Sequence, residues 1–79
     1  MQHGISLHSF GSALRNARIE SELTQAALAE RVGIHKSMVC KIERGVGNPT
    51  WSQIQRLVIG LQVPFEDLVV SARMFERVK

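Results

Sequence analysis

Residues 23–45 read LTQAALAERVGIHKSMVCKIERG, which is two helix-forming segments on either side of Gly33. Thr24 can cap the first segment, because its hydroxyl can accept a hydrogen bond from a free N–H of the first turn. Gly33 stands where that segment should end, since a left-handed residue at a helix end is least strained when it is glycine. Val39 and Ile42 are spaced i, i+3 and mark the buried side of the second segment. The sequence therefore predicts two short helices joined by a tight turn.

The outer side of the second predicted helix is polar and basic and carries no carboxylate. Its residues are Lys36, Ser37, Cys40, Lys41 and Arg44. Between residues 31 and 56 the chain has five basic side chains against one acidic side chain, a distribution typical of a surface that binds nucleic acid. The arrangement is that of a DNA-binding helix-turn-helix. An ordinary helical hairpin with a solvated basic face has the same spacing, so the pattern alone leaves both interpretations open.

Length and composition fit one small domain. The chain has 79 residues, a net charge of +3 and a hydrophobic content of 44%, values that allow a modest core. No apolar run is long enough to span a membrane, and residues 1–7 lack the pattern of a secretory signal. A single cysteine excludes an internal disulfide framework and fits a reducing compartment. We therefore expect a cytoplasmic chain.

The N-terminal part predicts a loose arm followed by a helix. Residues 1–8 are expected to form the arm, and the folded domain is expected to span residues 9–70. Ser9 is expected to cap the first helix, which reaches about Glu20. Apolar residues recur at helical spacing on one face of this helix, at Phe10, Leu14 and Ala17.

The C-terminal part predicts two further helices and no strand, so the fold class is all-α. Thr50 and Gln53 form a capping box for a helix that ends near Leu61. The helical period predicts that Trp51, on the apolar face of this helix, belongs to the core. Pro64 suits the first turn of a last helix, and apolar residues continue at helical spacing into residues 71–79.

Short motifs also follow one another along the chain in a fixed order. They are Leu14-Arg15 with Arg18, Leu23-Thr24-Gln25, Leu28-Ala29, Val32-Gly33-Ile34, Ile42-Glu43-Arg44-Gly45 and Asn48-Pro49-Thr50. Each motif is weak alone, but the ordered set resembles the Cro/repressor-type helix-turn-helix domains of the XRE-like family. The resemblance covers about residues 10–68. It implies a compact five-helix, lambda-repressor-like fold in which residues 36–44 form the recognition helix, lying in the major groove of DNA.

The resemblance implies DNA contacts for six side chains on the two helices of the motif. They are Gln25, Lys36, Ser37, Cys40, Lys41 and Arg44. Lys36, Ser37 and Lys41 fall where family members read base edges, and lysine can donate to the acceptors of guanine. Cys40 lies close beside them. Gln25 and Arg44 fall where the family touches the phosphate backbone, which sets register and affinity.

The same resemblance implies a structural ion pair and identifies three departures from the family pattern. Arg18 and Glu43 match a pair that bridges the first and third helices in many relatives. Glu22 stands where a turn glycine is usual, and Gln62 replaces another common turn glycine. His35 replaces the usual Ser or Thr cap of the recognition helix. These departures affect local turn geometry and remove no DNA-contacting group.

The C-terminal residues are more apolar than a chain end requires, and a small domain that exposes such a patch usually has a partner for it. We expect residues 71–79 to be a dimerisation tail, because two copies of a helix-turn-helix read two half-sites of a palindrome. The alternative is that the tail folds back on its own core. The residues proposed for the homodimer interface are Phe65, Val69, Met74 and Phe75.

The sequence thus predicts a sequence-specific regulator of transcription, most simply a repressor that occupies a palindromic operator as a homodimer. The alternative is an antitoxin-type interaction module whose main role is to bind a partner protein such as a toxin. No paired carboxylates, activated nucleophile or phosphate-binding glycine loop indicates an enzyme. His35 and Cys40 are five residues apart and the other histidines lie in the arm, so no metal site or cofactor is expected.

Overall fold

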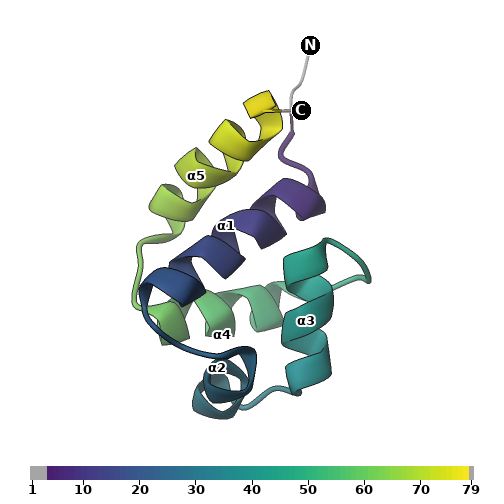
Figure 1. Ribbon diagram of the computed structural model, residues 1–79. Helices are drawn as coiled ribbons and strands as arrows, with labels where there is room; N and C mark the ends of the chain where they lie inside the picture. The colour runs from purple at the N-terminus through teal and green to yellow at the C-terminus, as the bar shows by residue number, and fades with distance from the viewer. Residues whose placement is uncertain (1–3, 79) are drawn as a thin grey trace.

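Five helices make up the described part of the chain, residues 4–78, in the computed structural model (Figure 1). They are α1 (Leu7–Glu20), α2 (Gln25–Val32), α3 (Lys36–Arg44), α4 (Trp51–Leu61) and α5 (Phe65–Val78). No strand occurs among the described residues. The predicted all-α, five-helix fold is therefore confirmed, and the recognition helix has the predicted bounds.

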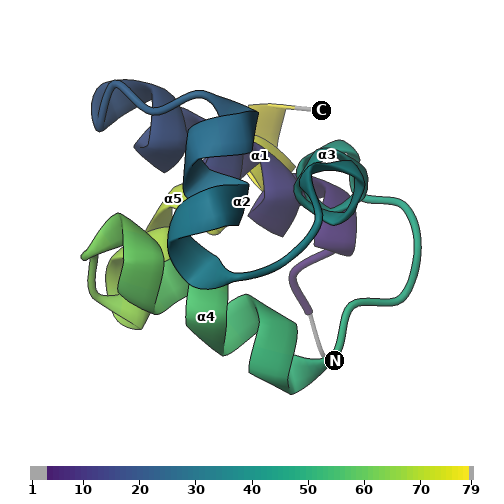
Figure 2. The same ribbon diagram turned by 90° about the horizontal axis from the view of Figure 1, so that it is seen from below.

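Helix α1 lies in the middle of the molecule, with α5 along one side and α3 against another (Figure 1). Helix α2 packs against both α3 and α4, and Figure 2 shows these three helices from below. The core lies where these helices meet, and its largest fully buried side chains are Leu14, Leu28, Ile42, Leu57, Val39 and Ser9. Helix α5 adds Leu68 and Ala72 to this core.

The capping residues predicted for α2 and α4 are found in the structure. Thr24 Oγ1 accepts a hydrogen bond from the Ala27 N–H at 3.0 Å. Gly33 ends α2 in the left-handed conformation, with φ of 74°. Thr50 and Gln53 form the reciprocal capping box of α4. Because these signals are local, they fix helix ends that the sequence alone can specify.

The N-terminal prediction was wrong in two respects. Helix α1 begins at Leu7, and its cap is Ser6 rather than Ser9, whose N–H donates to Ser6 Oγ at 3.1 Å. Ser6 in turn donates from its N–H and its hydroxyl to Glu76 Oε2 of α5, at 3.0 and 2.6 Å. Ile5 packs against the core, so residues 5–8 are not a loose arm. The first three residues of that arm lie outside the described part.

Two predictions for the C-terminal part were also wrong, the separate tail and the buried position of Trp51. Helix α5 is continuous across the expected domain boundary between residues 70 and 71, so the tail is part of the last helix. Trp51 was predicted to be in the core, but 58% of it is exposed. It lies in the first turn of α4, where its ring packs edge-on against the ring of Phe65 instead of entering the core. The two ring centroids are 5.5 Å apart.

The two positions that lack the family's turn glycine both adopt left-handed backbone, with φ of 60° at Glu22 and at Gln62. Glu22 ends α1 in a Schellman motif. Its N–H donates to Ile19 O at 2.9 Å, and the Leu23 N–H donates to Arg18 O at 3.2 Å. The turn therefore keeps the geometry that a glycine would give it, at the cost of backbone strain.

Replacing Glu22 by glycine is expected to stabilise the protein. A left-handed residue with a Cβ costs about 1–2 kcal/mol, and the extra freedom of glycine in the unfolded chain offsets about 0.5–1 kcal/mol of that gain. The net effect is a rise of a few degrees in Tm, measured by thermal unfolding. A Glu22→Ala variant is the matched control, since it removes the carboxylate and keeps the Cβ. Equal Tm values for the two variants would show that the backbone at Glu22 is not strained.

Candidate nucleic-acid interface

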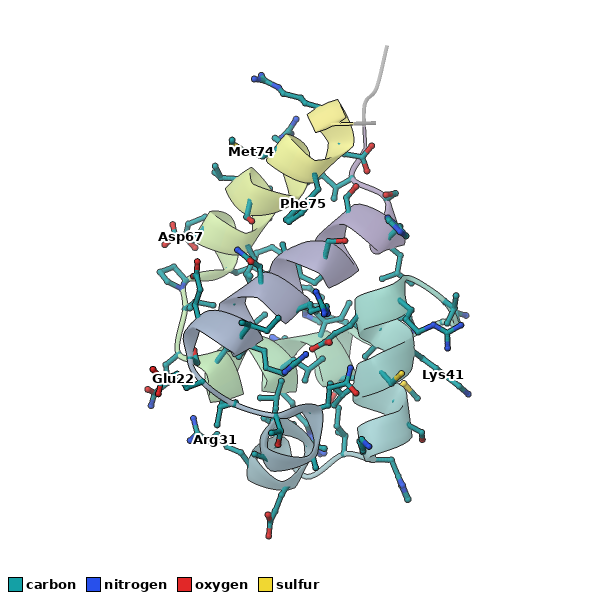
Figure 3. All side chains as sticks on the ribbon, in the orientation of Figure 1. Glu22, Arg31, Lys41, Asp67, Met74 and Phe75 are labelled. Carbon is teal, nitrogen blue, oxygen red and sulfur yellow. The ribbon has the colours of Figure 1, made fainter. Side chains whose placement is uncertain are left out.

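Helix α3 separates an apolar inner side from a polar outer side. Val39 and Ile42 are completely buried against the core. The opposite side carries Lys36, Ser37, Lys41 and Arg44, all exposed, while Cys40 is half-buried at the edge of this surface. Figure 3 shows Lys41 projecting away from the body of the protein. We call the five residues Lys36, Ser37, Cys40, Lys41 and Arg44 the outer face of α3.

The inner side of α3 is pressed closely onto α1. A Cβ added to Gly11 of α1 would overlap the carbonyl oxygen of Ile42 and lie 2.9 Å from that of Glu43. Gly45, which ends α3 with φ of 75°, similarly leaves no room for a side chain beside His8. These two glycines allow backbone to approach backbone, so the position of α3 is set by close contact along its C-terminal half.

A buried ion pair joins the same two helices. Arg18 Nε and Nη2 donate to the two carboxylate oxygens of Glu43, at 2.7 and 3.1 Å. Only 10% of the Arg18 side chain and 3% of the Glu43 side chain are exposed. Arg18 Nη1 also donates to Leu23 O at 2.7 Å, and Gln25 Nε2 donates to Glu43 Oε1 at 2.9 Å. The Glu43 carboxylate therefore links α1, α2 and α3.

This network positions Gln25 in the first turn of α2. Its amide braces Glu43 with one N–H and retains a second N–H for another acceptor. The first N–H groups of a helix lack partners within the helix, and they favour an anion. The start of α3 has no side-chain cap from His35, whereas Thr24 Oγ1 accepts one N–H at the start of α2. The site thus combines exposed lysines, an arginine and two helix starts on neighbouring helices.

The structure does not bring together the four residues expected to form the dimer interface. Phe65 lies beside Trp51 of α4, whereas Met74 and Phe75 line a separate recess with Asn16 of α1. Phe65 and Met74 are nine residues apart on one helix, which places them about 180° apart at roughly 100° per residue. Val69 is half-buried.

Sequence reasoning missed the residues that accompany Phe65. Trp51 and Ile59 of α4 are 58% and 73% exposed, and they line an apolar recess of about 230 Å³ with Gln55, Val58 and Phe65. We call Trp51, Ile59 and Phe65 the α4–α5 patch. The exposed position of Trp51 was not expected, because its helical spacing had assigned it to the core.

The described residues hold neither a cluster of metal ligands nor a membrane-spanning helix. Within residues 4–78, no three His, Cys, Asp or Glu side chains gather in a way that could hold a metal ion. No helix in this part of the chain is long and apolar enough to cross a membrane.

Comparison with known proteins identifies the family. A family model for a helix-turn-helix domain matches residues 9–71. The chain belongs to this helix-turn-helix family. The match confirms the family resemblance read from the sequence motifs, and it includes every residue of the outer face of α3.

Two curated relatives of this helix-turn-helix chain are named as transcriptional repressors. The chain is 36% identical over 73 residues to the repressor RghR of Bacillus subtilis, a match that covers 91% of this chain and 54% of the relative. It is 30% identical over 60 residues to the cryptic phage CTXphi repressor RstR of Vibrio cholerae, covering 76% of this chain and 54% of that protein. The chain thus spans about half the length of these relatives.

A solved structure with the same fold is the restriction-modification controller protein C.AhdI from Aeromonas hydrophila. It superposes with a TM-score of 0.74 and 34% sequence identity, over 78% of this chain and 94% of that chain. Most of this chain therefore shares its fold with a small controller protein.

Proposed function

We propose that this chain is a sequence-specific DNA-binding regulator of transcription, a repressor that binds a palindromic operator as a homodimer. The outer face of α3 supports this proposal most directly. It is basic, carries no carboxylate and is held on its inner side by α1, properties that suit a helix that lies in the major groove and reads base edges. The names of the two curated relatives support the same role. The role is that of a cytoplasmic binding protein rather than an enzyme.

The proposal gives the side chains of the site two kinds of task. Lys36, Ser37 and Lys41 are exposed on α3 and are assigned to base edges, with the half-buried Cys40 beside them. Arg44 at the end of α3 and Gln25 at the start of α2 are placed to bind phosphates on either side. Phosphate contacts supply affinity, and base contacts supply specificity.

Replacing Lys41 by alanine is expected to weaken binding to the preferred duplex by about 1–3 kcal/mol and to relax preference at one base pair of each half-site. Arg44→Ala is the matched control, because it removes one positive charge from the same helix at a phosphate position. The affinity of the Arg44→Ala variant should fall about equally on all DNA sequences. Its affinity should also depend less steeply on salt concentration, because one phosphate contact is lost. Both variants are measured by fluorescence anisotropy on the preferred duplex and on single-base variants. Unchanged base preference in Lys41→Ala would contradict its assignment.

The homodimer is proposed to form through the α4–α5 patch. Trp51, Ile59 and Phe65 make one continuous apolar surface with almost no polar lining, and exposed patches of this kind mark association sites. Phe65 is the member of the predicted interface that belongs to it. Met74 and Phe75 line a separate recess and are not needed for this contact.

Ile59→Asp is expected to shift the protein from dimer to monomer, because it would bury a carboxylate in an apolar contact. With 73% of Ile59 exposed, the monomer fold should be unaffected. Met74→Asp, at a position that is 61% exposed on the other side of α5, is the matched control and should remain dimeric. Sedimentation velocity over a concentration series measures both. A dimeric Ile59→Asp with a monomeric Met74→Asp would place the interface at the recess lined by Met74 and Phe75 instead.

A further inference from the structure

A basic recess lies at the contact between α2 and α4. It is an open hollow of about 530 Å³, lined by Arg31, Val32, Arg56, Ile59, Gly60 and Gln62. Gly60 allows the two helices to meet closely, because an added Cβ would overlap the side chain of Val32. We call this hollow the α2–α4 recess. None of its residues belongs to the outer face of α3.

Each arginine of the recess is held by the opposite helix. Arg31 of α2 donates from Nη1 to the carbonyl oxygen of Gly60 at 3.2 Å. Arg56 of α4 donates from Nη1 to the carbonyl oxygen of Gly33 at 3.4 Å, the weaker of the two bonds. A guanidinium has five N–H donors, so each side chain is oriented by one donor and keeps the others for a ligand.

The charge of the recess is not neutralised by a carboxylate. No Asp or Glu lines the recess, and within residues 4–78 neither Arg31 nor Arg56 forms an ion pair. The ends of α2 and α4 contribute a partial negative charge of about half a unit each. Two full positive charges exceed that sum, which leaves a net positive site with apolar walls from Val32 and Ile59.

We propose that the α2–α4 recess binds a small organic dianion that carries phosphate or carboxylate groups. Two guanidinium groups bind such groups through paired N–H donors, and a side-chain amide from Gln62 adds a further donor or acceptor. A hollow with apolar walls and a few convergent polar groups is the usual form of a small-ligand site. The ligand bridges α2 to α4 and so joins the first helix of the DNA-binding motif to the rest of the fold.

The location of the recess separates this ligand from operator DNA. Figure 3 shows Arg31 and Lys41 on opposite sides of the molecule. A duplex held against the outer face of α3 lies on the Lys41 side, so its phosphates are not the ligand of Arg31. Ile59 belongs both to the recess and to the α4–α5 patch, and a ligand here therefore lies at the edge of the proposed dimer contact.

The test is a titration of the ¹⁵N-labelled full chain, free of DNA, with sodium pyrophosphate and separately with succinate, followed by amide chemical shifts. Sodium chloride at matched ionic strength and pH is the reference. Saturable shifts at Gly33, Gly60 and Gln62 are expected with at least one of the two probes, and the stronger probe distinguishes a phosphate from a carboxylate ligand. Shifts confined to α3 would assign the anion to the DNA-binding side and overturn the proposal, as would shifts that grow linearly without saturation.

Substitutions test whether the probes bind at the α2–α4 recess or bind to positive charge anywhere on the surface. Arg31→Gln and Arg56→Gln are each expected to weaken probe binding about tenfold or more, because each removes a charged hydrogen-bonding group. Arg15→Gln is the matched control, since Arg15 is an exposed arginine of α1 outside the recess. The dispersion of the same spectra shows that each variant is folded. Unchanged affinity in both recess variants, or an equal loss in Arg15→Gln, would exclude the site. DNA binding is not needed for any of these results, so failure here leaves the proposed function untouched.

Discussion

Glu43→Ala is expected to destabilise the protein by about 3–5 kcal/mol, because it leaves the Arg18 guanidinium buried without its carboxylate. The same change removes the acceptor of the Gln25 amide, so α2 loses its brace to α3. Measured by urea denaturation, a loss of this size is a large fraction of the stability of a small domain.

A double variant tests whether the cost comes from the stranded charge. Arg18→Met combined with Glu43→Leu replaces the pair by apolar side chains of similar size, and it should recover most of the stability lost in Glu43→Ala. DNA affinity of the double variant should remain below that of the parent, because Gln25 still lacks its partner. If Glu43→Ala costs less than about 1 kcal/mol, the value of an exposed ion pair, the buried network does not organise the three helices.

Gly11→Ala is expected to destabilise the protein by about 1–3 kcal/mol, the usual cost of inserting a methyl group into a fully packed contact. The added Cβ meets the backbone of Ile42 and Glu43, which cannot move like a flexible side chain. In an open helical position the same change would stabilise α1 by about 0.5–1 kcal/mol. The sign of the effect therefore reports how closely α1 and α3 approach.

The consequence of Gly11→Ala for function is a displaced recognition helix, and operator affinity should fall together with stability. Gly4→Ala is the matched control, because a Cβ added there meets nothing within 4 Å. Thermal unfolding and fluorescence anisotropy on the preferred duplex measure the two effects. A Gly11→Ala variant that is as stable as Gly4→Ala and binds DNA equally well would show that the approach of α1 to α3 is looser than described.

The sequence specified the central helices well because their end signals are local. Thr24, Gly33 and the Thr50–Gln53 box act within a few residues of themselves, and each is found in the predicted conformation. The start of α1 was misplaced because Ser6 and Ser9 are both suitable caps by local pattern, and the contact that distinguishes Ser6 is its pair of hydrogen bonds to Glu76, 70 residues away. No local pattern contains that contact.

The sequence predicted the DNA-binding surface better than it predicted the dimer interface. The outer face of α3 follows from helical spacing alone, since Val39 and Ile42 fix which side is buried. The four dimer residues were grouped by apolar character along the chain, without the neighbouring helices. The structure places Phe65 beside α4 and Met74 at a separate recess, and it adds Trp51, whose apolar spacing had suggested the core. Position on a helix is thus readable from sequence, but the helix that covers it is not.

Binding of the purified chain to a pool of randomised duplex DNA, at two salt concentrations with sequencing of the bound fraction, tests the central claim most directly. A dimeric operator-binding regulator predicts enrichment of one palindrome, with half-sites about one helical turn apart and affinity that falls steeply as salt rises. Weak binding that high salt abolishes, with no enriched sequence, would contradict it and favour a chain whose main role is to bind a partner protein.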